Sequence, residues 1–184
     1  MKEVVKHITD KFDVIEMFKF VEEDGNSMIA KGIEDFDEKR QMRISQDESI
    51  DEVDLIRNFL KEVFEDDAFE SVEGETLEVS LCSCLIAYPG LLEQVPHTDF
   101  SDWPDHPPSS NFIVFVSMMP NTKIVVFDNT NKRSVVMLNA GDVFVGRGDI
   151  VHAGAAYDKR NVRLHFYVKR ESCPLPNNET YLIV

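Results

Sequence analysis

From residue 77 onward, the chain is a succession of short strand-like runs separated by turn residues. Six runs are rich in β-branched and aromatic residues, at 81–88, 111–119, 123–128, 134–138, 142–145 and 162–168. Turn-forming residues separate them: Pro89-Gly90, Pro120-Asn121, Asn129-Thr130-Asn131 and Ala140-Gly141-Asp142. Closely spaced strands without intervening helices are typical of antiparallel sandwiches and barrels. The sequence therefore predicts a mainly β core.

The N-terminal part has a different character, acidic and with helical periodicity. Ser49-Ile50-Asp51-Glu52 is a capping-box pattern, and Val53, Ile56, Leu60, Val63 and Phe64 follow it at helical spacing. This pattern predicts a helix over about 50–65 whose apolar stripe packs on a sheet. Residues 12–33 fit either a hairpin around Asp24-Gly25 or a short helix over 14–22. The predicted class is α+β: mainly β with N-terminal helices.

At 184 residues, the chain is expected to form one domain. We expect residues 1–76 to be mostly helical and acidic, 77–170 to form the β core, and 171–184 to be a C-terminal tail. The formal net charge of −15 argues against nucleic acid as a partner, since an acidic surface repels phosphates. A protein or a small molecule is the expected substrate, and the sequence leaves the oligomeric state open.

The cysteines and the N-terminal segment indicate in which cellular compartment the protein is expected. The three cysteines are an odd number and form no C-x-x-C pair, and residues 1–7 lack an apolar leader. No uncharged stretch approaches the ~20 residues that a membrane span needs. We therefore expect an intracellular, cytoplasmic protein with no membrane association.

Three residues in the β region have the types and order of a metal site. His97 and Asp99 are two apart, so on an extended strand both side chains leave the same face. His152 follows a turn-rich segment that can turn its imidazole inward. Two imidazoles and one carboxylate can hold a divalent metal on one face and leave the other open, as non-haem Fe(II) oxygenases require. Arg163, eleven residues later, could bind an anionic co-substrate beside the metal.

Each candidate has an ordinary alternative when taken singly. His97 could be a loop histidine, Asp99 a turn cap, and His152 a core histidine bonded to backbone. The last strand adds independent support, because Arg163, His165 and Tyr167 alternate with apolar neighbours. Such a strand lies either at the surface or in a barrel wall whose polar face lines a cavity. The apolar helix face over 53–64 could cover the outer side, which favours the cavity.

The pattern H-T-D, fifty-two residues, H, ten residues and R resembles the Fe(II)/2-oxoglutarate-dependent dioxygenases over residues 80–170. The resemblance implies a double-stranded β-helix, also called a jelly roll, with Fe(II) held by His97, Asp99 and His152. It implies that Arg163 binds the distal carboxylate of 2-oxoglutarate, with Tyr88 as a second contact or a core tyrosine. Prolyl-hydroxylase-like members often carry a small hydroxyl residue where this chain has His165, which is the third predicted co-substrate contact.

The same resemblance implies an enzyme that hydroxylates its substrate and converts 2-oxoglutarate to succinate and CO2. The loop over 100–110 follows the predicted ligands, and its Phe100, Trp103 and His106 are expected to border the substrate entrance. Two alternatives remain. A cupin-type metalloprotein would not use 2-oxoglutarate, although Arg147 stands where a cupin motif expects proline. The second alternative is a non-catalytic barrel that binds a partner.

Overall fold

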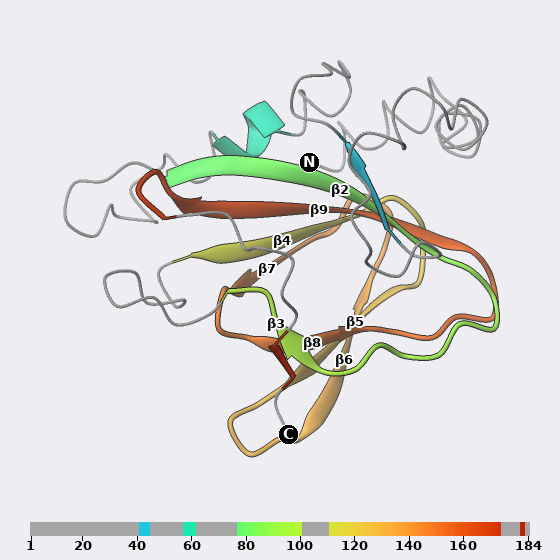
Figure 1. The fold of residues 1–184 in the computed structure, drawn as a ribbon. Helices are drawn as coiled ribbons and strands as arrows, with labels where there is room; N and C mark the ends of the chain where they lie inside the picture. The colour runs from blue at the N-terminus through green and yellow to red at the C-terminus, as the bar shows by residue number, and fades with distance from the viewer. Residues whose placement is uncertain (1–40, 45–56, 62–76, 101–110, 174–180, 183–184) are drawn as a thin grey trace.

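The computed structural model describes residues 41–44, 57–61, 77–100, 111–173 and 181–182. These residues contain two five-stranded sheets, in the orders β1-β2-β9-β4-β7 and β10-β3-β8-β5-β6 (Figure 1). The strand bounds are Gln41–Ile44 (β1), Leu77–Ala87 (β2), His97–Thr98 (β3), Phe112–Ser117 (β4), Thr122–Phe127 (β5), Arg133–Leu138 (β6), Val143–Arg147 (β7), Val151–Gly154 (β8), Asn161–Arg170 (β9) and Tyr181–Leu182 (β10).

The strands wind back and forth between the two sheets. Along the chain, β2, β4, β7 and β9 belong to the first sheet, whereas β3, β5, β6 and β8 belong to the second. Every neighbouring pair is antiparallel. This winding is that of a jelly roll. The expected double-stranded β-helix is confirmed.

The predicted turns lie where the backbone needs a left-handed residue. Asn121 and Asn131 have φ values of 60° and 62°, and Gly141 has a φ of 84°. Asparagine and glycine tolerate this region better than other residues. Asp128 also stabilises the β5–β6 turn, because its Oδ1 accepts hydrogen bonds from the backbone N–H groups of Thr130 and Lys132. Local residue chemistry therefore determines where the strands end.

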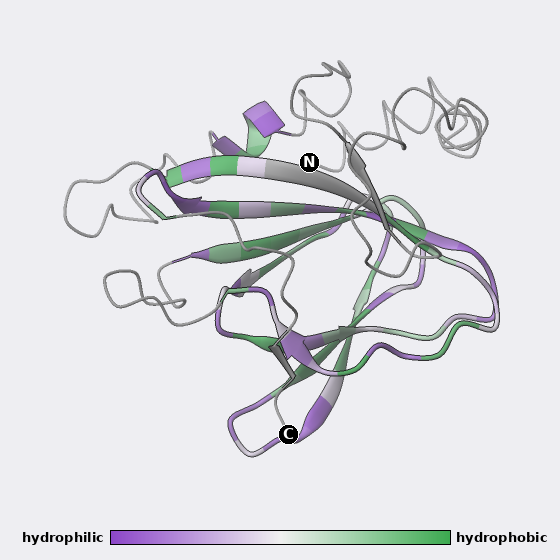
Figure 2. Cartoon of the chain, in the orientation of Figure 1, coloured by the Kyte–Doolittle hydropathy of each residue, from purple (hydrophilic) through white to green (hydrophobic). Residues whose placement is uncertain are grey.

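The core lies between the sheets. It is built around Phe115 of β4, Ile124 of β5 and Leu85 of β2, which are 1–6% exposed. Figure 2 shows β4 as apolar along most of its length. Each such side chain contributes about 1.5–3 kcal/mol by leaving water.

The middle strand of the first sheet, β9, buries both of its faces. The four apolar residues that alternate along β9 are at most 1% exposed: Val162, Leu164, Phe166 and Val168. Residues 57–61 are helical and lie on the outer side of β2 in Figure 1, with Leu60 only 1% exposed. Arg163, His165 and Tyr167 line a cavity on the opposite face. The interpretation of this strand as a cavity wall, with its apolar face covered, is confirmed.

The ends of the chain differ in part from expectation. Residues 41–44, in the region expected to be mostly helical, form β1 and pair with β2, because that strand has an open edge there. Residues 181–182, expected to be tail, form β10 and pair with β3. The helix predicted over about 50–65 is described only at 57–61, where it is helical, and residues 12–33 lie outside the described residues. The described part contains no helix long and apolar enough to cross a membrane.

Candidate active site

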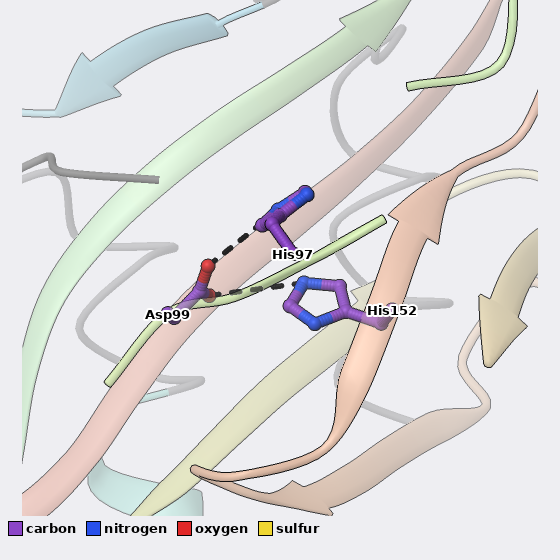
Figure 3. A group of neighbouring side chains, drawn as sticks. All are labelled: His97, Asp99 and His152. Carbon is purple, nitrogen blue, oxygen red and sulfur yellow. Dashed lines mark ion pairs between the residues drawn. The ribbon is translucent and has the colours of Figure 1, made fainter. Parts of the chain in front are cut away.

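The pairing of β3 with β8 brings the predicted metal ligands together. His97 of β3 and His152 of β8 are directly opposite each other in the antiparallel pair. Asp99 is the first residue after β3 and lies two positions from His97, so its side chain leaves on the same side as that of His97. Figure 3 shows the carboxylate beside the two imidazoles, with a dashed line to each of them. Residues far apart in sequence therefore meet through one strand pair.

The three side chains form a compact group. Nε2 of His97 lies 3.6 Å from Oδ1 of Asp99, and Nε2 of His152 lies 3.8 Å from Oδ2. One ligand atom from each residue lies within 4.8 Å of the others. Their side chains are only 12%, 11% and 5% exposed, in the order His97, Asp99 and His152. The group is thus small enough to surround one ion and is largely shielded from solvent.

Backbone carbonyls orient both imidazoles. Nδ1 of His97 lies 2.8 Å from the carbonyl oxygen of Val95, and Nδ1 of His152 lies 3.3 Å from that of Ile150. Because a carbonyl oxygen only accepts hydrogen bonds, each Nδ1 must carry the proton. Each Nε2 then presents its lone pair to the centre of the group, as a ligating histidine requires.

The charge states also suit a cation. Burial lowers the pKa of His152 to about 4, so this imidazole is neutral at neutral pH. Burial alone would raise the pKa of Asp99, but the surrounding imidazoles, His152 first, hold it below its usual range. Oδ2 of Asp99 is buried and has no hydrogen-bond partner among the described residues. Two imidazole donors beside an ionised, under-bonded carboxylate fit a divalent metal.

Arg163 reaches the same cavity from the other sheet. It lies on β9, is 5% exposed, and its guanidinium lies over the Phe115 ring at 5.5 Å from the centroid. The cavity that holds the three ligand candidates is also lined by Arg163, His165 and Gln94. A buried guanidinium in a cavity with little water binds a carboxylate more strongly than one at the surface.

The other predicted site residues are placed differently. Tyr88 is 37% exposed, faces the guanidinium of Arg160, and does not line the cavity that holds Arg163. Phe100 is 3% exposed and packs edge-on against Tyr167, so it belongs to the core. Trp103 and His106 lie outside the described residues.

Gln94 and Gly154 are neighbours of Arg163 that the sequence did not single out. The backbone N–H of Gln94 donates to the carbonyl of Gly154 at 2.8 Å, and the N–H of Gly154 donates to Oε1 of Gln94 at 2.9 Å. Both residues line a pocket that Arg163 also lines. Gln94 has no motif of its own, and only its position three residues before His97 could have drawn attention to it.

Comparisons with known proteins extend these observations. No family model and no curated protein matches the sequence. Among solved structures, AviO1 from Streptomyces viridochromogenes Tue57 is similar with a TM-score of 0.66 and 14% identity, covering 95% of this chain and 87% of that one. A Pseudomonas putida prolyl-4-hydroxylase has a TM-score of 0.61 and 12% identity, covering 93% and 88%.

A third similar structure is an oxidoreductase of the 2OG-Fe(II) oxygenase family from Burkholderia pseudomallei. Its TM-score is 0.55 at 15% identity, with 78% of this chain and 75% of that one covered. At sequence identities this low, the TM-scores show that the folds are shared. The chain therefore resembles the 2OG-Fe(II) oxygenases in fold, and it carries a His-Asp-His group on and beside two strands of that fold.

Proposed function

We propose that this protein is an Fe(II)- and 2-oxoglutarate-dependent oxygenase. The observation that carries the proposal is the convergence of His97, Asp99 and His152 in one cavity with the guanidinium of Arg163. A facial triad leaves metal positions open for co-substrate and dioxygen, and the arginine supplies the charge for a dicarboxylate. A cupin-type enzyme that does not use 2-oxoglutarate has no need of this arginine.

Each side chain has a defined task in this proposal. His97, Asp99 and His152 hold Fe(II), and Arg163 binds the distal carboxylate of 2-oxoglutarate. The iron, when bound, supplies the oxidation chemistry that converts 2-oxoglutarate to succinate and CO2 and oxidises the substrate. The apolar side chains of Leu85, Phe115 and Ile124 line the same cavity and exclude water from it.

We propose hydroxylation as the outcome, on a protein side chain or a small molecule. Three of the similar structures are prolyl hydroxylases, one of them in complex with a peptide fragment. Their likeness to this chain supports the choice of reaction type and leaves both substrate classes in the proposal.

The proposal is tested by turnover without added substrate. Purified protein loaded anaerobically with Fe(II) should, on exposure to air, release succinate in an amount that depends on 2-oxoglutarate. Removal of the metal with a chelator should abolish the release, and added Fe(II) should restore it. If the protein binds metal but forms no succinate, a cupin-type metalloprotein that does not use 2-oxoglutarate is supported. If it binds no metal, a non-catalytic barrel that binds a partner is supported.

A second prediction concerns Gly154. A Cβ at this position would clash with Oε1 of Gln94 and lie 3.0 Å from Nη2 of Arg163. We expect Gly154→Ala to displace both groups, to cost about 1–3 kcal/mol of stability, and to raise the 2-oxoglutarate concentration for half-maximal turnover about tenfold, as a misplaced arginine would. Titration of succinate release against 2-oxoglutarate measures the effect.

Gly90→Ala is the matched control. Gly90 has a φ of 84°, so alanine strains the backbone there, yet its Cβ would meet nothing within 4 Å. This variant should lose stability without a change in the 2-oxoglutarate requirement. A similar rise in both variants would show that lost stability, rather than the position of Arg163, causes the effect.

A further inference from the structure

The imidazole of His165 lies against the carboxylate of Asp99. Its Nε2 is 3.3 Å from Oδ2 of Asp99, closer than either of the other two imidazoles comes to this carboxylate. His165 does not belong to the compact group of three that could hold the metal. The structure therefore places a third imidazole beside the carboxylate, outside the ligand set.

The ring of His165 is held rigidly. It lies in the middle of β9, where its backbone is opposite Phe115 of β4 on one side and Ser83 of β2 on the other. The imidazole stacks on the Phe115 ring with 4.5 Å between centroids, and Tyr167 contacts it edge-on at 4.7 Å. With its side chain 6% exposed, the ring has little room to turn.

Apart from facing each other, the two atoms have no hydrogen-bond partner in the described part of the chain. Among the residues that the structure describes, Nε2 of His165 and Oδ2 of Asp99 are buried and make no hydrogen bond. A buried donor or acceptor left unsatisfied costs about 1–3 kcal/mol. Because the two atoms are already 3.3 Å apart, a small rotation of the carboxylate is enough to satisfy both.

We propose that His165 is a positioning residue: its Nε2–H donates a hydrogen bond to Oδ2 of Asp99 and thereby presents Oδ1 to the metal. This inference rests on the proposed metal site. It gives His165 a role through Asp99 rather than the direct contact with 2-oxoglutarate expected from the sequence. Oδ1 is the oxygen nearer to His97, at 3.6 Å from its Nε2.

The consequence is a carboxylate that offers one oxygen. A facial triad needs a single oxygen from its carboxylate, because co-substrate and dioxygen share the other positions. A carboxylate free to rotate can place both oxygens on the metal and occupy one of those positions. A hydrogen bond to Oδ2 prevents this, as outer-shell partners do for metal ligands generally.

The test uses Co(II) alone, without 2-oxoglutarate, so that only the metal site is measured. His165→Phe keeps a ring for the stack on Phe115 but has no donor. We expect it to weaken Co(II) binding by about 10-fold or more, the usual effect of losing an outer-shell partner, and to shift the visible absorption bands of the bound ion. His165→Gln retains an N–H near the Nε2 position and should bind within about threefold of the unmodified protein.

Two further variants separate positioning from stability. His165→Asn places its N–H near the Nδ1 position and should fail to rescue, which keeps the test decisive if the Phe variant does not fold. Asn111→Ala removes a buried amide that donates a hydrogen bond to Sγ of Cys173 and accepts one from the backbone N–H of Arg170. Neither hydrogen bond involves Asp99. It should lower the melting temperature and leave Co(II) affinity and spectrum unchanged.

The outcomes distinguish this inference from the proposed function. Unmodified protein that binds no Co(II) would overturn the metal site itself. If the unmodified protein binds Co(II), and His165→Phe binds it equally well with the same spectrum, the positioning role alone is overturned. In a second titration, of 2-oxoglutarate into the Co(II)-loaded variant, weaker co-substrate binding at unchanged Co(II) affinity would assign His165 to the co-substrate and also overturn the positioning role.

Discussion

Asp99→Ala is expected to abolish 2-oxoglutarate turnover and to weaken Fe(II) or Co(II) binding by more than about 100-fold, beyond the usual effect of losing an outer-shell partner. Asp99 supplies the only carboxylate in the group of three and faces both imidazoles. Without it, two imidazoles remain, and no negative charge balances the metal. Metal titration and succinate release measure the two effects.

The Asp99→Ala fold should survive, because the side chain lies at the edge of the core and is 11% exposed. Circular dichroism and a thermal melt should therefore show only a modest change. Asp149→Ala is the matched control, since that carboxylate is three residues from His152 but pairs with Arg147 at the surface. Succinate release that persists in Asp99→Ala would refute the assignment of this residue as a ligand.

Arg163→Ala should raise the 2-oxoglutarate concentration for half-maximal turnover on the order of 100-fold, since loss of one partner of a buried charge pair costs about 2–5 kcal/mol. Metal affinity should stay within about twofold, because Arg163 lies on β9 and is not one of the ligand candidates. Arg163→Lys keeps the charge but cannot form a bidentate pair with a carboxylate, so an intermediate 2-oxoglutarate concentration for half-maximal turnover is expected. Succinate release and Co(II) titration, run in parallel, separate the two quantities.

Arg147→Ala is the control for Arg163. Arg147 is a largely exposed arginine on β7 that pairs with Asp149. Its removal should change neither the 2-oxoglutarate requirement nor metal affinity. If Arg163→Ala instead loses metal and co-substrate binding to the same extent, Arg163 supports the fold of the cavity rather than binding the co-substrate.

The fold class could be predicted because its signals are local. Alternation along β9 marked one face as apolar and the other as polar, and asparagine or glycine marked turns such as those at Asn121 and Gly141. The shortest strands, such as β3 and β10, each contain two residues. Such strands are too short for a periodic pattern. The extended conformation expected at His97 rested on the H-x-D spacing alone, and residues 181–182 were expected to be tail.

The site could be predicted only in part. His97, Asp99, His152 and Arg163 were recognisable by residue type, order and spacing, and the structure brings all four to one cavity. For Tyr88 the sequence left a co-substrate contact and a core tyrosine open, and in the structure its ring faces the guanidinium of Arg160. The direction of a side chain at a strand end depends on neighbours that are distant in sequence, so spacing cannot determine it.

The sequence by itself determined the strand pattern, the turns and the chemical types of the candidate ligands, because these depend on residues within a few positions of one another. Only the tertiary structure decided which of those residues meet. The register that sets His97 opposite His152, and the sheet packing that brings Arg163 and His165 to the same cavity, depend on contacts between distant segments. Such contacts arise from burying the faces of two sheets against each other, and no local pattern encodes that packing.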